Sequence, residues 1–239
     1  MEDGTLGFSQ FKQLDISRGQ AKKVGEAIAN IVSNASIESL VHPQTMHTTE
    51  TPFTLRLWTV EDYHQMAAAG IFHPEERVEL IAGQIIRMSA KGTAHTAAVR
   101  RTAKILRNLL ENQADVYTQD PIQLDDFSEP EPDIAVVRIN PLDYADHHPT
   151  PSEVYLIIEV ADSSFKYDCE TKAKAYAQSG IADYWVLDVN NRKLHRFREP
   201  TEDGYQSEVI ISQEASLSLL QFPTLAIALQ DMLPPVIVQ

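Results

Sequence analysis

Cysteine is nearly absent from this sequence: Cys169 is the single one among 239 residues, so no disulfide can form within the chain. That usage fits a reducing compartment. The sequence also has no run of about 18 apolar residues, the length that a membrane-spanning helix needs. No basic and then apolar segment follows Met1, as it would in a secretory signal peptide. We therefore expect a cytoplasmic protein without a membrane span.

Positive charge is also scarce, because 20 Lys and Arg residues stand against 34 Asp and Glu residues and give a formal net charge of −14. Proteins that coat nucleic acid are usually basic, since they replace the counterions around phosphate. The composition therefore counts against a general DNA-coating protein. It is compatible with an enzyme that has a local basic patch and metal ions beside its own carboxylates.

The first part of the chain differs from the rest. Residues 1–52 are polar and show no strong alternation, although a weak helix fits 18–40, where the apolar residues fall near one face. We expect a flexible or loosely docked N-terminal extension, and an upstream extension of the reading frame before Met46 is an alternative. The compact domain is expected at 53–239, since 43% apolar residues suffice for a core.

The pattern after residue 53 mixes helices and strands, which predicts the α/β class with a mixed central β-sheet flanked by helices. Helices are expected at 59–69, 93–112 and 167–178, where apolar residues recur every three to four positions. Strands are expected at 116–119, 121–124, 133–138, 154–160 and 183–189, and hairpins at 77–88 and 193–211.

Two carboxylates occupy matching positions on neighbouring apolar strands. Asp133 begins one strand, and Glu159 lies near the end of the next. If these strands pair antiparallel, the two side chains meet at one edge of the sheet. Two buried carboxylates side by side are unfavourable, and a divalent cation offsets that repulsion. Oxygen ligands from two carboxylates together with substrate phosphate suit Mg²⁺.

The helix that follows Glu159 carries Asp168, Lys172 and Tyr176 at a spacing of four residues, so the three share one face. Lys172 can therefore point back to the carboxylates. A lysine there can orient the attacking water and stabilise charge on a phosphoryl group. Tyr176 is more typical of packing than of catalysis.

Further candidates lie upstream. Glu79 is the only charged residue in an otherwise apolar strand, and His95 opens the next helix. On that helix Arg100, Lys104 and Arg107 form a basic stripe, which is either a solvated face or a set of phosphate contacts.

Each of these residues alone has a simpler interpretation. Asp133 follows a proline and could merely start a strand, and Lys172 could pair with Asp168 on a solvated helix face. Glu79 could pair with an arginine of its own exposed hairpin. An apolar strand rarely buries a carboxylate such as Glu159 without a partner, so the set in this order favours a site.

The ordered set resembles the PD-(D/E)xK nuclease superfamily and, more closely, the Uma-two family of restriction-type endonucleases. The resemblance covers about residues 54–198 and implies a restriction endonuclease-like fold for 53–239. The segments that carry it are Glu79–Ile85, His95, Glu131–Ile134, Glu159–Ser164, Asp168 with Lys172 and Tyr176, and Asp183–Val186.

The resemblance implies roles for these residues. Asp133, Glu159 and the Val160 carbonyl would bind Mg²⁺, with Mn²⁺ as an alternative, and Lys172 would act on the water. Glu79 would bind a second metal ion or hold a water. The implied reaction is phosphodiester hydrolysis in DNA. A homodimer is also implied, because two sites are needed to cut both strands in one encounter.

One departure concerns the lysine, which the superfamily places two residues after the glutamate. Ala161 occupies that position here. Lys172 matches the lysine that the Uma-two family takes from the following helix, and Lys174 is an alternative rotated by about 200° on an ideal helix. Two other functions stay open: a catalytically silent nuclease fold used for binding or assembly, and a hydrolase of smaller phosphate esters.

Overall fold

The structure is a computed structural model that describes residues 54–236 of the chain. The extension predicted at 1–52 and the weak helix at 18–40 lie outside the described residues, and the domain boundary at 52/53 stays a prediction. The chain divides into two compact units: Thr51–Tyr63 with Glu76–Gln239, and Met1–Glu50 with His64–Glu75. The first of these contains every strand described below.

Helix α2 (Val60–Ala68), predicted at 59–69, begins in the larger unit at a capping box. The Asp62 amide donates to Thr59 Oγ1 at 3.1 Å, and the Thr59 amide donates to Asp62 Oδ2 at 3.2 Å. The helix ends before Gly70, whose φ of +69° suits a glycine. Within the described residues, no helix is both long and apolar enough to cross a membrane.

A six-stranded mixed sheet forms the centre of the larger unit, in the order β3-β4-β5-β6-β7-β8. Only β5 and β6 run parallel, and every other neighbouring pair in this sheet is antiparallel. The predicted mixed sheet is therefore confirmed. Its strands are β3 (Asp115–Tyr117), β4 (Ile134–Val137), β5 (Val154–Ala161), β6 (Asp183–Asp188), β7 (Lys193–Thr201) and β8 (Gly204–Ser212).

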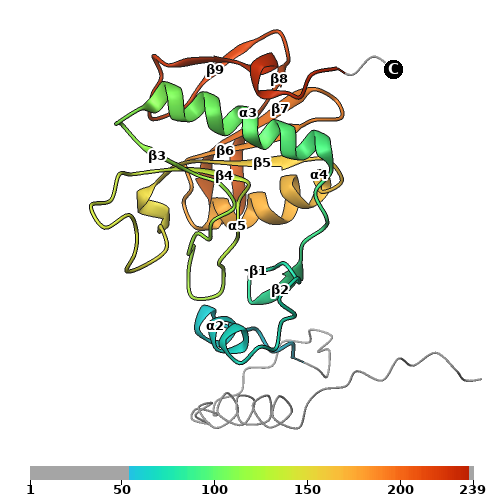
Figure 1. Cartoon of the computed structure of the whole chain (residues 1–239), viewed down its shortest axis with the longest axis vertical. Helices are drawn as coiled ribbons and strands as arrows, with labels where there is room; N and C mark the ends of the chain where they lie inside the picture. The colour runs from blue at the N-terminus through green and yellow to red at the C-terminus, as the bar shows by residue number, and fades with distance from the viewer. Residues whose placement is uncertain (1–53, 237–239) are drawn as a thin grey trace, which may run out of the picture. The chain divides into compact units, whose positions relative to one another are not determined.

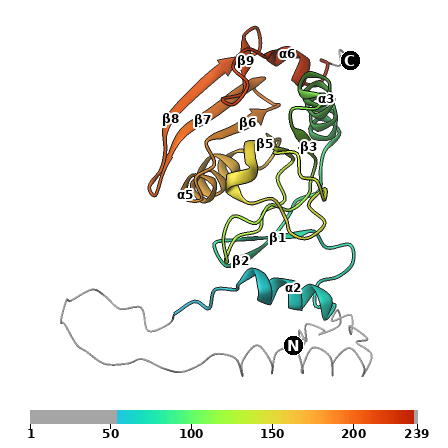
Figure 2. The same cartoon turned by 90° about the vertical axis from the view of Figure 1, so that its left-hand side faces the viewer.

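Helices cover both faces of this sheet. Figures 1 and 2 show α3 (Thr93–Leu110) on one face and α5 (Ala173–Gln178) on the other. Side chains alternate along β5, so Leu156, Ile158 and Val160 pack in the core beneath α3. Ile157 and Ala161 pack on the α5 face, and Glu159, which stands between them in the alternation, belongs to that face.

The segment that leads into α5 is not one regular helix. It consists of α4 (Phe165–Tyr167), a π-helical turn at Asp168–Lys172 and then α5. At the wide turn, the Asp168 carbonyl accepts hydrogen bonds from the Ala173 amide and, at 2.9 Å, from the hydroxyl of Tyr184 on β6. A single π-turn of this kind is common near functional sites.

The hairpin predicted at 77–88 is present as β1 and β2, which join Val78–Ile81 to Gln84–Arg87 through a turn at Ala82 and Gly83. Both turn residues have positive φ, 48° and 73°, as a two-residue hairpin turn requires. Gly83 also has a steric reason, because a Cβ there would lie 2.5 Å from Leu57 Cβ.

The strand predicted at 121–124 is wrong. This segment forms no strand, although the Ile122 amide donates to the Pro130 carbonyl and the Leu124 amide to the Ser128 carbonyl. Prolines at 121, 130 and 132 remove the donors that a continuous ladder needs. The remaining elements are η1 (Pro151–Glu153), β9 (Ser216–Ser218), β10 (Ala226–Ala228) and α6 (Leu229–Met232).

Candidate active site

Asp133 and Glu159 meet where β4 begins and β5 approaches its end. The strands pair antiparallel with Ile134 opposite Ile158, which places the two acidic residues beside each other. The Val160 amide donates to Asp133 Oδ2 at 3.0 Å, and the Asp133 amide lies 3.3 Å from Glu159 Oε2. The predicted antiparallel pairing is thus confirmed, and backbone donors fix both carboxylates.

Lys172 connects Glu159 to a third carboxylate. Its Nζ lies 2.9 Å from Glu159 Oε1 and 3.0 Å from Glu79 Oε2, and its side chain is only 5% exposed. Tyr176 Oη donates to the same Glu159 oxygen at 2.9 Å. Lys172 therefore does not lie on a solvated face with Asp168 as its partner, and Glu79 is buried rather than paired on an exposed hairpin.

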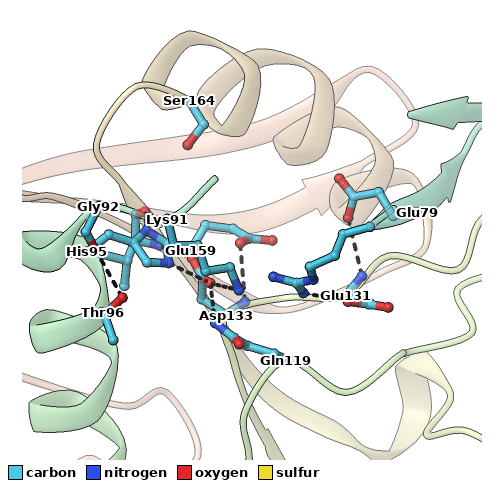
Figure 3. Close-up of polar contacts among 12 residues, drawn as sticks. Glu79, Lys91, Gly92, His95, Thr96, Gln119, Glu131, Asp133, Glu159 and Ser164 are labelled. Atoms are coloured by element: carbon cyan, nitrogen blue, oxygen red, sulfur yellow. Dashed lines mark hydrogen bonds and ion pairs between the residues drawn. The ribbon is translucent and has the colours of Figure 1, made fainter. Parts of the chain in front are cut away.

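His95 bridges two oxygens on the other side of the site. Its Nδ1 lies 2.8 Å from the Val160 carbonyl oxygen and its Nε2 lies 3.1 Å from Asp133 Oδ1. Since both partners accept hydrogen bonds, both ring nitrogens donate when Asp133 is ionised, which makes the ring an imidazolium. One ring therefore links the Asp133 carboxylate to the Val160 carbonyl, which lie on opposite sides of it. Figure 3 shows Lys91, His95 and Gln119 gathered around Asp133, with Glu79 at the opposite end of the group.

Three residues of this group were missed from the sequence. Lys91 Nζ lies 3.6 Å from Asp133 Oδ1, and Gln119 Nε2 lies 3.3 Å from the same oxygen. Tyr167 lies on the cavity wall. Lys91 precedes His95 by four residues, which was the one available signal, but the loop it occupies has no periodicity. Gln119 has a φ of +63° just after β3, a conformation that the strand pattern does not predict.

The remaining candidates fall into two groups. Asp168 is buried beside the site and accepts a hydrogen bond from Ser164 Oγ at 2.6 Å. The others are exposed and do not line the cavity, so the structure does not bring them to the carboxylates: Lys174, Arg100, Lys104 and Arg107. Arg107 instead donates to the Val116 carbonyl at 3.0 Å, which ties α3 to β3.

The site opens into a cavity of about 360 Å³. The carboxylates of Glu79, Asp133, Glu159 and Asp168 line it together with both lysines, Lys91 and Lys172. Four buried carboxylates thus share this space with two ammonium groups, and the half-buried Glu131 and Asp162 line it as well. Such a volume is typical of a site for a small ligand or for one part of a larger substrate.

The pKa values of the acidic groups shift in different directions, according to their neighbours. Burial raises the pKa of Glu159 to about 8, although the charge of Lys172 opposes this effect. Burial likewise raises the pKa of Asp168 to about 6. Burial alone would also raise the pKa of Asp133, but the hydrogen bond and charge of His95 outweigh it, and the net pKa is lowered. The site therefore favours the ionised form of Asp133 and disfavours the ionised form of Glu159, unless a cation compensates.

The basic groups follow the same electrostatics. Burial lowers the pKa of His95, but the hydrogen bonds to Asp133 and Val160 raise it above its ordinary value overall. Lys172 is also desolvated, yet the charges of Glu159 and Glu79 raise its pKa. For Lys91 burial prevails, and its pKa is lowered despite the attraction of Asp133.

The donor chemistry fits a divalent cation. Asp133, Glu159 and the Val160 carbonyl offer hard oxygen atoms, the ligands that Mg²⁺ prefers. The carboxylates of Asp133 and Glu159 lie beside each other, since the Asp133 amide is 3.3 Å from Glu159 Oε2 and the Val160 amide is 3.0 Å from Asp133 Oδ2. A cation there would also relieve the excess of buried negative charge.

Comparisons with known proteins agree with this fold. A crystal structure of "a putative nuclease belonging to DUF820 from Anabaena variabilis" matches with a TM-score of 0.57 and 15% identity, over 73% of this chain and 96% of that one. No curated protein matches the sequence. The model of the Uma2 family, described as "Putative restriction endonuclease", matches residues 60–230, more than half of the chain. Both the ordered residues and this match lead to one conclusion: the chain belongs to the Uma2 family.

Proposed function

We propose that this protein is a Mg²⁺-dependent endonuclease that hydrolyses phosphodiester bonds in DNA, with Mn²⁺ as an alternative ion. The observation that carries the proposal is that the carboxylates of Asp133 and Glu159 lie beside each other at the facing ends of β4 and β5. Membership of a family described as restriction endonucleases supports a nuclease function.

In this proposal, Asp133, Glu159 and the Val160 carbonyl hold the ion. A bound divalent cation supplies Lewis-acid polarisation of the phosphoryl oxygen and lowers the pKa of a ligated water. The protein's part is to keep the ligands oriented. The Val160 amide and Gln119 hold Asp133, while Lys172 and Tyr176 hold Glu159.

Lys172 and Glu79 have further proposed roles. Lys172 lines the cavity, so it is positioned to orient the attacking water as well as to neutralise two carboxylates. Glu79 accepts from the Glu131 amide at 3.3 Å and from Lys172. It is available to hold a water or a second ion on that side of Lys172.

The test is cleavage of supercoiled plasmid in Mg²⁺ and, separately, in Mn²⁺. Wild type should nick or linearise the plasmid. Asp133→Asn should reduce the rate by more than about 100-fold, beyond what loss of a residue that merely supports a ligand causes. Asp146→Asn is the matched control, because the Asp146 side chain is 58% exposed. Lys172→Met should lose cleavage and Lys174→Met should retain it.

The contrary result is also defined. Wild type that cleaves in neither metal, and binds neither metal by calorimetry, contradicts the proposed nuclease. It would favour the catalytically silent module, which the acidic composition and Ala161 at the expected lysine position also favour. Binding of nucleic acid or protein without turnover then becomes the property to measure.

We also propose that the active form is a homodimer, because cutting both DNA strands in one encounter takes two sites. Strand β8 lies at the edge of the sheet and exposes Val209 and Ile210, so it offers a pairing edge to a second copy. Light scattering on the purified protein measures the mass directly. A monomer under conditions where both strands are cut in a single encounter would contradict this proposal.

A further inference from the structure

The Lys91 ammonium is buried without a hydrogen-bond partner in the part of the chain that the structure describes. Its side chain is 18% exposed, and Asp133 Oδ1, at 3.6 Å, is close enough for attraction but beyond hydrogen-bond distance. An ammonium has three donor hydrogens, and leaving buried donors unsatisfied is unfavourable. Because Lys91 lies on the cavity wall, a ligand in the cavity can supply the missing acceptor.

The two lysines of the cavity are in opposite situations. Lys172 has carboxylate oxygens at 2.9 and 3.0 Å, so its charge is already committed to Glu159 and Glu79. Lys91 has one carboxylate nearby, and Asp133 is shared with His95, Gln119 and the Val160 amide. A metal ion on Asp133 would compete for that carboxylate further. Lys91 is therefore the ammonium that remains available to an incoming anion.

A second buried donor lies on the same cavity wall. Tyr167 Oη has no hydrogen-bond partner among the described residues, and Tyr167 lines the cavity. No carboxylate of the cavity lies within hydrogen-bond distance of either donor, the Lys91 ammonium or the Tyr167 hydroxyl. A ligand rich in acceptor oxygens and free of donors is complementary to this pair. The phosphate group of a phosphodiester has this chemistry.

We propose that Lys91 binds a non-bridging oxygen of the substrate phosphate next to Asp133, and that Tyr167 donates a second hydrogen bond to the same substrate. This inference rests on the proposed function and names the residue that holds the reacting group. Since Lys91 lies within 3.6 Å of Asp133, a phosphate that reaches Lys91 also lies beside the proposed metal ligand.

The experiment compares full-length Lys91→Met, Lys91→Arg and Tyr167→Phe with wild type. Lys166→Met is the matched control, since its side chain is 84% exposed and its nearest carboxylate, on Glu170, is 4.0 Å away. Three quantities are measured: kcat and KM for plasmid cleavage in Mg²⁺, affinity for a labelled oligonucleotide in Ca²⁺ by anisotropy, and affinity for Mg²⁺ by calorimetry.

We expect Lys91→Met to reduce kcat/KM and oligonucleotide affinity by about 10- to 100-fold, the range for hydrogen bonds to a charged group. Lys91→Arg should recover part of the loss because it keeps the charge and the donors. Tyr167→Phe should lose less, and Lys166→Met should match wild type. Affinity for Mg²⁺ should stay the same or increase in Lys91→Met, because a positive charge beside Asp133 has been removed.

The measurement of Mg²⁺ affinity separates substrate binding from a structural role. If Lys91→Met weakens Mg²⁺ and oligonucleotide binding together, Lys91 serves to hold Asp133 and the inference is overturned. It is also overturned if Lys91→Met equals wild type in both cleavage and binding. If wild type does not cleave, the proposed function fails, and oligonucleotide binding alone decides: a loss confined to Lys91→Met supports the inference, and equal or absent binding rejects it.

Discussion

The two faces of β5 show how one strand serves both the core and the site. Beneath α3, Leu156, Ile158 and Val160 join an apolar cluster in which β5 contributes no charged group. On the α5 face, Glu159 takes the place between Ile157 and Ala161. Both faces are buried, so burial alone does not distinguish them.

The difference lies in what the opposing helical segment contributes. The segment with α5 supplies Lys172 and Tyr176 to the Glu159 carboxylate, whereas α3 supplies alanine, valine and leucine to the middle of the opposite face. A buried carboxylate is tolerated where a paired ammonium and a hydroxyl are provided with it. The comparison predicts that changes on the α3 face act on stability, and that changes on the α5 face act mainly on metal binding.

The largest effect on stability is expected on the apolar face. Ile158 is fully buried, and Ile158→Ala should lower the free energy of unfolding by about 2–5 kcal/mol through lost burial and a cavity. Urea denaturation measures this. Ile139→Ala, at a side chain that is 46% exposed, is the control and should change stability by less than about 0.5 kcal/mol.

This substitution also tests whether the two faces are independent. Below its melting range, Ile158→Ala should bind Mg²⁺ with the affinity of wild type, because the Glu159 side chain lies on the opposite face of β5. A large loss of metal affinity in the folded variant would contradict the separation of roles, and would indicate that packing under α3 sets the position of Asp133.

Much of this arrangement could be predicted from the sequence, because β4 and β5 carry local patterns that are hard to mistake. Their apolar runs predict buried strands, and antiparallel pairing then brings Asp133 to Glu159. Lys172 could be placed at the same point because only about 13 residues separate it from Glu159, a distance spanned by one turn and a short helical segment.

The parts that could not be predicted depend on contacts between distant residues. The sequence of Asp168–Lys172 predicts an ordinary α-helix, whereas the structure has a π-turn there. The Tyr184 hydroxyl that donates to the Asp168 carbonyl comes from β6, which is distant in the sequence. Lys91 and Gln119 lie in segments without periodicity and reach Asp133 only through the tertiary fold. The resemblance in the sequence covers about residues 54–198, whereas the family model matches residues 60–230. The resemblance depends on the proposed site residues, and none of them lies after residue 198.

The free energy of unfolding should depend on pH more steeply in wild type than in Glu159→Gln, which replaces the carboxylate on the α5 face with a neutral amide. In protein stripped of metal, the pKa of Glu159 lies near 8, above the ordinary 4.5. The folded state thus binds this proton more tightly than the unfolded chain. Its stabilising contribution is complete below about pH 4.5 and is lost as pH rises to about 8.

Glu159→Gln removes this titration while keeping the shape of the side chain. The free energy of unfolding should therefore fall less steeply with pH in Glu159→Gln than in wild type between pH 4.5 and 8. Urea denaturation in a chelator at several pH values measures both slopes. Equal slopes would show that Glu159 titrates normally, and that the α5 face holds its carboxylate without strain.

The smallest effect, and the sharpest test of the comparison, concerns two tyrosines on the α5 face, Tyr176, which is buried, and Tyr205, which is half-buried. Tyr176 Oη donates to Glu159 Oε1 at 2.9 Å, and Tyr205 Oη donates to the Ile181 carbonyl at 2.8 Å. Each Tyr→Phe change removes one hydrogen bond from an acceptor on a buried residue, so both should lower stability by about 1 kcal/mol. Only Tyr176→Phe releases a proposed metal ligand, and it should weaken Mg²⁺ binding by about 10-fold while Tyr205→Phe leaves it unchanged. Calorimetric titration of Mg²⁺ into both variants separates the roles: equal metal affinities would mean that Tyr176 contributes packing alone, and that Lys172 is sufficient to hold Glu159 in place.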